Sequence, residues 1–451
     1  MGHSRRVCII SLGCAKNLAD SEAILGQVAA SDARVQICSS PDDADVVIIN
    51  TCGFLRAARD EAEATITAVE RTIGGRPGSR VVVTGCYSQL WKSEVARRHP
   101  GLFAILGVDA LYQEPFWQSV LKTNADATAE RAIDVATRRT FAAPRLVSGQ
   151  GSYAYLKVSD GCSQHCSYCT IPAIKGRLVS RTVDTILGEA QDLIRTGISE
   201  VVLVSQNTSA YGMDLSQDGK PLLEVLLKEL DGLRGVSVIR LLYLYPTLVT
   251  TRLLEAIGAS AHIAHYVDIP LQHTSPEVLK AMKRPWAEST TTGLIRRVRA
   301  VLPDAALRST FIVGFPGETE EQFGQLLIDI REMHLEHASA FAYSREPLAP
   351  SSSYRGQVHW ATKQRRLRGF MEVQQEESLA INQARYVGHT CAVMVDSVAE
   401  DEVLGRTLQD APEVDNLVHL KNPRKRTIVP GSIWLARISS AGAYDLEGKV
   451  L

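Results

Sequence analysis

Three of the chain's nine cysteines lie within eight residues, at Cys162, Cys166 and Cys169. We call them the central triplet. A chain of 451 residues that is 45% hydrophobic and 22% charged has the composition of an ordinary globular protein of about two or three domains, which folds without disulfides. We expect a cytosolic protein, because the N-terminus has no signal-peptide cleavage site and no stretch reaches about eighteen apolar residues. In that reducing compartment, clustered cysteines indicate a metal or catalytic site.

Two kinds of metal site compete for the central triplet. Structural zinc needs four ligands in a closed tetrahedron, usually from two separated pairs, and no second pair lies nearby, although His165 lies inside the loop. A 4Fe-4S cluster prefers thiolate ligands, and three thiolates leave one iron open for a substrate or cofactor. We therefore interpret the triplet as an iron-sulfur site and keep zinc as the alternative.

Strand-like and helix-like segments alternate through the middle of the chain, with a repeat of about 25 to 45 residues. One helical pattern, TVDTILGEAQDLIRTG, ends at Gly197, which we predict to be its C′ glycine. This alternation predicts a parallel α/β barrel, and six strands make it a partial (β/α)6 barrel. Such barrels carry their sites at the carboxyl ends of the strands, and the central triplet directly follows the first strand. The predicted strands are YAYLKVSD, EVVLVSQN, SVIRLLYLYP, HYVDIPLQH, LRSTFIVGFP and ASAFAYS.

In the first 90 residues, three strand-like runs each end at a cysteine, namely Cys14, Cys52 and Cys86. We call these the N-terminal triplet. Helical patterns separate the runs, which predicts an open parallel sheet whose strand ends bring the three thiols to one edge. Each cysteine alone is better explained as a small buried apolar residue than as a ligand. Together they favour a second cluster with three cysteine ligands. The remaining cysteines show no such convergence, and we expect Cys8, Cys38 and Cys391 to be structural.

The end of the chain forms a third unit. A polar helical pattern from Thr362 to Arg385 leads into short strand-like runs, TCAVMVDSV, VLGRTL, NLVHL and SIWLARISS, which predict a small β-barrel that binds an RNA or protein partner. Seven basic and nine acidic residues lie between Tyr386 and Leu451, and the whole chain has a formal charge of -1. For the basic run KNPRKR from Lys421 we favour a solvated loop, with an RNA contact as the alternative.

The spacing of the central triplet, with Tyr168 before its last cysteine, resembles the signature of radical S-adenosylmethionine (SAM) enzymes. The order of the three units resembles the methylthiotransferase family. That resemblance implies an N-terminal domain at residues 1–125 with an auxiliary 4Fe-4S cluster, a radical SAM domain at 148–384, and a C-terminal TRAM domain at 385–451 that recognises the substrate. The motifs that carry the resemblance to the RimO branch are SLGCAKNLADSE, NTCGF, AYLKVSDGC, IPAIKGR, YVDIPLQH, LRSTFIVGFPGETEEQF, DAPEVD and AYDLEG.

The resemblance also implies a mechanism with two 4Fe-4S clusters. The central triplet would hold the cluster at which SAM is cleaved to a 5′-deoxyadenosyl radical, and the N-terminal triplet would hold the auxiliary cluster. SAM would be both methyl donor and radical source, with an electron donor such as flavodoxin. The product would carry a methylthio group on the β-carbon of an aspartate in a ribosomal small-subunit protein. We expect SAM contacts from Tyr168, Gln206, Gln272 and Gly314, and we place Glu318 and Glu320 in the first turn of a helix.

Other functions stay open at this stage. A MiaB-type transfer-RNA methylthiotransferase usually carries Gln-Met-Asn after its first cysteine, whereas this chain has Ala15, Lys16 and Asn17, and its mildly acidic tail also favours a protein substrate. Ala15 and Asn207 depart from the RimO pattern, which leaves open a relative that acts on another protein or peptide. A non-catalytic RNA- or ribosome-binding module is the remaining alternative.

Overall fold

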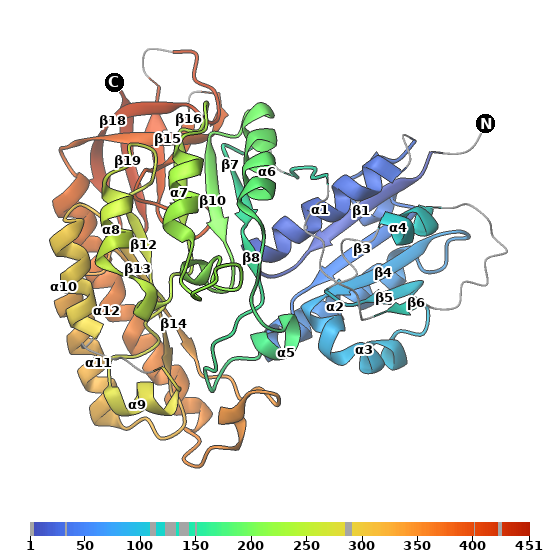
Figure 1. The fold of residues 1–451 in the computed structure, drawn as a ribbon, viewed down its shortest axis with the longest axis horizontal. Helices are drawn as coiled ribbons and strands as arrows, with labels where there is room; N and C mark the ends of the chain where they lie inside the picture. The colour runs from blue at the N-terminus through green and yellow to red at the C-terminus, as the bar shows by residue number, and fades with distance from the viewer. Residues whose placement is uncertain are drawn as a thin grey trace. The chain divides into compact units, whose positions relative to one another are not determined.

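The computed structural model describes residues 4–31, 34–108, 114–121, 132–134, 144–148, 151–284, 291–400, 402–422 and 426–451 (Figure 1). The chain forms two compact units, and each is described by itself. The N-terminal unit comprises Met1–Ser148 with Gly161–Ser163 and Thr170–Arg177. The C-terminal unit comprises Gly149–Asp160, Gln164–Cys169 and Leu178–Leu451. The central triplet is therefore divided, because Cys162 belongs to the first unit and the other two cysteines to the second.

A six-stranded sheet forms the centre of the N-terminal unit, in the order β2-β1-β3-β4-β5-β6 with every pair parallel. All six residues of β3 are buried, as is typical of a parallel strand covered on both faces. Helices α2 and α3 cover one face and α1 and α4 the other. The predicted open parallel domain is confirmed. The strands are β1 (Arg6–Ser11), β2 (Gln36–Ile37), β3 (Val46–Thr51), β4 (Arg80–Gly85), β5 (Ala104–Leu106) and β6 (Ala132–Asp134), and the helices are α1 (Ala15–Ser31), α2 (Arg56–Ile73), α3 (Cys86–Arg98), α4 (Glu114–Leu121) and α5 (Ile171–Lys175).

Six parallel strands of the C-terminal unit form two three-stranded sheets, β11-β10-β7 and β12-β13-β14. A single parallel bridge between Ile239 and Ile263 connects β11 to the segment before β12. This arrangement confirms the predicted partial barrel. The strands are β7 (Tyr153–Lys157), β10 (Glu200–Val204), β11 (Val238–Leu241), β12 (Tyr266–Asp268), β13 (Ala306–Val313) and β14 (His337–Ala342), and a short antiparallel pair, β8 (Ser159–Asp160) and β9 (Val179–Ser180), follows β7 along the chain.

Helices between these strands begin and end at residues that the sequence marks. The Thr182 side chain accepts a hydrogen bond from the Thr185 amide at the start of α6, and Gly197, with φ of +98°, ends the helix as its C′ residue. The amides of Gly197 and Ile198 donate to carbonyls of the last turn, which confirms the prediction at Gly197. The helices are α6 (Val183–Arg195), α7 (Leu223–Asp231), α8 (Thr251–Gly258), α9 (Pro276–Ala281), α10 (Thr291–Val301), α11 (Glu320–Met333) and α12 (Trp360–Tyr386).

The end of the chain is a closed barrel in the order β15-β16-β17-β19-β18. It confirms the predicted small β-barrel and four of its strands. The fifth strand, β19, was missed because Glu447 and Lys449 alternate with buried residues in a short, polar sequence. Positions 423–425 of the basic run KNPRKR lie outside the described residues. The strands are β15 (Thr390–Ala399), β16 (Glu402–Thr407), β17 (Leu417–Lys421), β18 (Ile433–Ala441) and β19 (Asp445–Val450).

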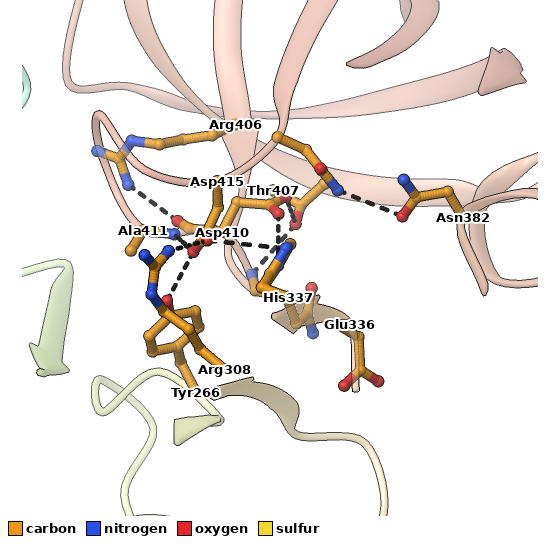
Figure 2. A network of polar contacts seen from close by, with 12 residues as sticks. Tyr266, Arg308, Glu336, His337, Asn382, Arg406, Thr407, Asp410, Ala411 and Asp415 are labelled. Carbon is orange, nitrogen blue, oxygen red and sulfur yellow. Dashed lines mark hydrogen bonds and ion pairs between the residues drawn. The ribbon is translucent and has the colours of Figure 1, made fainter. Parts of the chain in front are cut away.

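A buried polar network joins the small barrel to the partial barrel within the C-terminal unit (Figure 2). His337, the first residue of β14, lies with Nε2 3.1 Å from Asp410 Oδ1 and with Nδ1 3.7 Å from Asp415 Oδ1. The Tyr266 hydroxyl donates to Asp415 Oδ2 at 2.6 Å, and Arg308 forms an ion pair with the same carboxylate. Burial opposes ionisation of Asp415, but His337 and Arg308 outweigh burial and lower its pKa.

A second ionic group lies beside the first. Glu200, the first residue of β10, is fully buried, with Oε1 2.6 Å from Arg240 Nε, and its other oxygen contacts Arg406 of β16. Arg406 also lies 3.1 Å from Asp396 of β15. The contacting residues lie in or next to the first half of the parallel strands. The small barrel is therefore attached to the amino-terminal ends of these strands, away from the carboxyl ends where sites of parallel barrels lie.

Candidate functional site

The N-terminal triplet lies at the carboxyl ends of three neighbouring strands. Strands β1, β3 and β4 are adjacent and parallel, so the segments that follow them emerge at one edge of the sheet. Cys52 directly follows β3, and Cys86 directly follows β4 as the first residue of α3. A β-carbon on Gly13, which has φ of +95°, would lie 2.7 Å from the β-carbon of Cys52. Glycine before Cys14 therefore lets the loop after β1 lie against Cys52.

Asn17 connects the three loops that carry these cysteines. Its side-chain amide donates to the carbonyl of Leu12 at 2.9 Å and to that of Thr51 at 3.1 Å. Its Oδ1 lies 3.8 Å from the sulfur of Cys86. Asn17 is buried, so each of these contacts replaces hydration that the group has lost. The sequence analysis did not assign Asn17 a role, and the available signal was its position in the first turn of the helix that follows Cys14.

The thiols of the N-terminal triplet differ in environment. Cys14 is exposed, Cys52 is half-buried and Cys86 is buried. Burial raises the pKa of the Cys52 thiol, and a hydrogen bond from the Phe54 backbone offsets this only in part. Binding of iron at such a thiol therefore releases a proton. The nine cysteines form no disulfide.

The donor geometry bears on zinc, the alternative considered above. Among the described residues, no three His, Cys, Asp or Glu side chains are grouped closely enough to hold one metal ion. A 4Fe-4S cluster takes each thiolate on a different iron, so its ligands are spaced more widely than those of a single ion. A single zinc ion at the central triplet, the alternative kept above, would need such a group.

Two cysteines of the central triplet are fixed by contacts within the C-terminal unit. The Cys169 amide donates to the Cys166 carbonyl at 3.1 Å, and Ser167 between them donates from its amide to Met282 and from its hydroxyl to Ala281, at the end of α9. Arg284 Nη1 lies 3.8 Å from the Cys166 sulfur. This contact places a buried guanidinium directly beside a cysteine of the central triplet. No sequence pattern indicated Arg284, which approaches the loop only through the fold.

Tyr168 lies in an apolar cluster that includes Met282, Phe315 and Tyr343. Its hydroxyl accepts a hydrogen bond from Arg284 at 3.3 Å. Burial raises the pKa of Tyr168 well above its ordinary value, so the phenol stays protonated. The ring of Tyr168 is therefore held between the apolar cluster and Arg284.

Two glutamines follow strands of the partial barrel. Gln206 follows β10, and its Nε2 donates to Asp160 Oδ1 at 2.7 Å, while its Oε1 is buried without a hydrogen-bond partner among the described residues. A buried acceptor of this kind is suited to a ligand. Gln272 adopts the left-handed region with φ of +73°, and its backbone pairs with Thr310 and Ile312 of β13. Positive φ at a non-glycine residue is unusual and is enriched at functional sites.

Gly314 begins a tight turn after β13. It has φ of +73°, and a β-carbon there would lie 2.4 Å from Lys363 Cγ. The Glu318 carboxylate accepts hydrogen bonds from the amides of Gly314 and, at 2.9 Å, Phe315. The same carboxylate, fully buried, lies 3.3 Å from Arg366. The expectation that Glu318 lies in the first turn of a helix is wrong, because Thr319 caps α11 and the helix begins one residue later, at Glu320.

Comparison with known proteins identifies the family. Residues 6–107 match uncharacterized protein family UPF0004, residues 156–330 match the radical SAM superfamily, and residues 387–451 match the TRAM domain. The ribosomal protein uS12 methylthiotransferase RimO of Syntrophus aciditrophicus is 38% identical over 99% of this chain and 98% of its own length. Its counterpart in Carboxydothermus hydrogenoformans is 38% identical over 98% and 99%. This chain belongs to the RimO methylthiotransferase family.

Solved structures with the same fold are more distant from this RimO family member. The radical S-adenosylmethionine methyltransferase TsrM from Kitasatospora setae, with cobalamin and a 4Fe-4S cluster bound, has a TM-score of 0.54 at 16% identity over 77% of each chain. The cobalamin-dependent radical enzyme OxsB has a TM-score of 0.51 at 12% identity over 82% of this chain and 56% of its own. At these identities the likeness concerns the fold, and it confirms the predicted α/β architecture.

The two departures from the RimO pattern occupy ordinary structural positions. Ala15 is the first residue of α1. Asn207 is buried, and its Oδ1 accepts a hydrogen bond from the Ser209 hydroxyl at 2.9 Å. The Ser209 hydroxyl in turn accepts from the Tyr245 amide at 2.8 Å, so Asn207 helps to connect the loops after β10 and β11.

Among the described residues, no helix is long and apolar enough to span a membrane.

Proposed function

We propose that this protein is a radical SAM methylthiotransferase that inserts a methylthio group at the β-carbon of an aspartate in a ribosomal small-subunit protein, uS12 in the named relatives. The observation that carries the proposal is the meeting of three cysteine-bearing strand ends at one edge of the N-terminal sheet, in a chain that also contains a radical SAM domain. A chain that performed only SAM cleavage would need no such second set of thiols.

The residues proposed to hold the cofactors are the two triplets. The central triplet would bind the 4Fe-4S cluster of the radical SAM domain, and the N-terminal triplet a second one. When bound, the two clusters and SAM supply the radical and the methylthio group. Arg284 contacts the Cys166 sulfur, and Asn17 holds the loops of the N-terminal triplet together. These contacts prepare the thiols before any metal arrives.

SAM is proposed to bind at the carboxyl ends of the barrel strands. Gln206 offers a buried amide oxygen that has no hydrogen-bond partner among the described residues, and Gly314 has the positive φ that glycine adopts readily. Gln272 is held at a strained strand end by two backbone hydrogen bonds. Tyr168 would present its ring from the apolar cluster beside the cysteine loop. These four side chains or backbones are proposed to exclude water and to orient SAM.

The partners follow from the family resemblance. The proposed domains are the N-terminal domain at residues 1–125, the radical SAM domain at 148–384 and the TRAM barrel at 385–451. The protein substrate would bind through the TRAM barrel. A reducing partner such as flavodoxin would supply the electrons. RNA would contact the basic run from Lys421. The reaction would occur in the cytoplasm.

A count of iron and sulfide tests the proposal. The protein is prepared and reconstituted without oxygen, as wild type and as a triple variant in which the central triplet is replaced by alanine. About eight irons should fall to about four, because each triplet would hold four. The matched control is the triple alanine variant of Cys8, Cys38 and Cys391, which should keep about eight.

A result of about four irons falling to none would refute the proposal that the N-terminal triplet binds a cluster. The loaded wild type is then given SAM, a reductant and either the ribosomal protein or transfer RNA. Mass spectrometry of an aspartate peptide should show the added methylthio group. Modification of the transfer RNA alone would assign the protein to the MiaB-type activity instead.

A further inference from the structure

A short segment just after the central triplet belongs to the N-terminal unit. Residues 170–177, which include α5, pack with that unit, as do residues 161–163 at the start of the triplet. Ile174 of α5 is buried in one apolar cluster with Cys86 and Val108. The loop that carries the central triplet is thus fixed at both of its ends to the unit that carries the N-terminal triplet.

A buried ion pair strengthens this attachment. Lys175, the last residue of α5, has Nζ 3.2 Å from Asp20 Oδ2, and the two side chains are only 3% and 1% exposed. Two charges buried this deeply lose most of their hydration, and the short ion pair offsets part of that cost. An arrangement that separated Lys175 from Asp20 would therefore be disfavoured.

Backbone contacts continue the connection from Lys175 to Cys162. The Cys162 amide donates to the Gly176 carbonyl at 3.1 Å. Gly161, with φ of +76°, allows close approach, since a β-carbon there would lie 2.2 Å from the Arg177 carbonyl oxygen. Cys162 is therefore held by the residue next to Lys175.

At the other end, Asp20 lies in α1, whose first residue follows Cys14. Asp20 is separated from Cys14 by less than two helical turns of a rigid element. An uninterrupted path then runs from Cys162 through Gly176, Lys175 and Asp20 to Cys14, and every contact in it lies within the N-terminal unit.

We propose that Lys175 and Asp20 are positioning residues that set the spacing between Cys162 and the N-terminal triplet. The purpose of this spacing rests on the proposed function, in which both triplets act on one substrate carbon. A displacement of about 1 Å at a reacting centre can reduce the rate by about a hundredfold. Neither residue needs to touch the substrate, because each acts through the segment it holds.

The test compares two double variants, each of which removes one buried ion pair made by a residue of α1. Asp20→Asn with Lys175→Met removes both charges of this ion pair. Glu22→Gln with Arg145→Met is the matched control, because Glu22 and Arg145 form an equally buried pair, with side chains 5% and 6% exposed, that joins α1 to residues 144–148 instead. Both variants lose one buried ion pair from α1.

Hydrogen exchange in the iron-free protein is the first measurement. Peptides that cover 161–163 and 170–177 should exchange at least tenfold faster in the Asp20/Lys175 variant and within twofold of wild type in the control. This measurement needs neither clusters nor activity. Equal exchange in the Asp20/Lys175 variant and wild type, or equal acceleration in the control, would overturn the proposal.

The second measurement uses the reconstituted proteins. The amount of methylthiolated product per 5′-deoxyadenosine should fall at least tenfold in the Asp20/Lys175 variant, while the rate of SAM cleavage and the iron content stay within twofold of wild type. A purely structural role would lower iron content and cleavage together and leave the ratio unchanged, which would contradict positioning. A wild type that cleaves SAM without methylthiolation would refute the proposed function. The hydrogen-exchange result would still test whether the Lys175–Asp20 pair holds residues 161–163 and 170–177.

Asp20→Glu provides a second variant in case the charge-free pair fails to fold. It keeps both charges and moves the carboxylate by one methylene. Positioning predicts normal exchange protection and iron content with a lower ratio of product to cleaved SAM. A ratio equal to that of wild type would count against the proposal.

Discussion

Asn17 shows how one buried amide can organise a site to which it contributes no ligand. It donates to the carbonyls of Leu12 and Thr51, and its oxygen lies near the Cys86 sulfur. Its own carbonyl accepts a hydrogen bond from Asn50 at 2.9 Å. The three loops therefore depend on one side chain, and their backbone carbonyls have lost water on folding.

We expect Asn17→Ala to impair the N-terminal triplet and spare the central one. The change removes the side-chain donor to the Leu12 and Thr51 carbonyls, which costs roughly 1–3 kcal/mol at the buried Thr51 carbonyl and less at the part-buried Leu12 carbonyl. Reconstituted iron should fall from about eight towards about four per chain. Asn382→Ala is the control, because Asn382 is equally buried and also donates to two carbonyls, those of Gly442 and Ala443, in the small barrel. The control should lose comparable stability and keep its iron, and equal iron loss in both variants would contradict this role.

The turn between β13 and α11 is held by the carboxylate of Glu318, which the sequence pattern predicted to lie in the first turn of a helix. Glu318 accepts hydrogen bonds from two successive amides and pairs with Arg366, whereas Glu320 is 59% exposed on the first turn of α11. The sequence pattern cannot separate two acids two residues apart. Thr319 separates them structurally, because its side chain caps the helix.

Glu318→Gln is expected to loosen this turn. The neutral amide accepts hydrogen bonds more weakly, and Arg366 loses a buried charged partner, so stability should fall by about 2 kcal/mol. If Gly314 contacts SAM as proposed, the dissociation constant for SAM should rise about tenfold, equivalent to about 1.4 kcal/mol. Calorimetric titration of iron-loaded protein measures this. Glu320→Gln should leave SAM affinity unchanged and cost less than about 1 kcal/mol, and equal effects of the two changes would show that Glu318 does not hold the turn.

At the scale of the whole C-terminal unit, attachment of the small barrel depends on buried charge. His337 of β14 lies next to Asp410 and Asp415, which belong to the small barrel. Arg308 and Tyr266, on neighbouring strands, also contact Asp415 (Figure 2). Burial alone would lower the pKa of His337, but the two carboxylates outweigh burial and the repulsion from Arg308, and they raise its pKa above 6.5.

This direction of shift predicts that attachment weakens as pH rises. A group with a raised folded-state pKa stabilises fully below its unfolded value, near 6.5, and its contribution is lost as pH increases through the folded pKa. Hydrogen exchange in β14 and in residues 408–416, corrected for the intrinsic rate, should therefore accelerate between pH 6 and pH 9, by about tenfold for each 1.4 kcal/mol of stability lost. His337→Gln should remove most of this pH dependence. His389→Gln, at an exposed position, should keep it.

Much of the fold was predictable because it depends on local periodicity. Alternating strands and helices indicated both parallel architectures, and Gly197 marked a helix end through a backbone conformation that glycine adopts readily. The strands before Cys14, Cys52 and Cys86 were predicted, and the structure confirms that they are parallel neighbours. Strand β19 was missed, since a short strand with charged residues on one face has little hydrophobic signal.

The sequence by itself therefore determined the fold class, the order of the three parts and the spacing of the central triplet, because these are properties of adjacent or regularly repeated residues. Only the tertiary structure decided which distant groups meet. Lys175 and Asp20 are 155 positions apart, Arg284 and Cys166 are 118 apart, and Glu200 and Arg406 are 206 apart. Such pairs leave no periodic signal, because buried charges and amides are matched by the packing of whole elements.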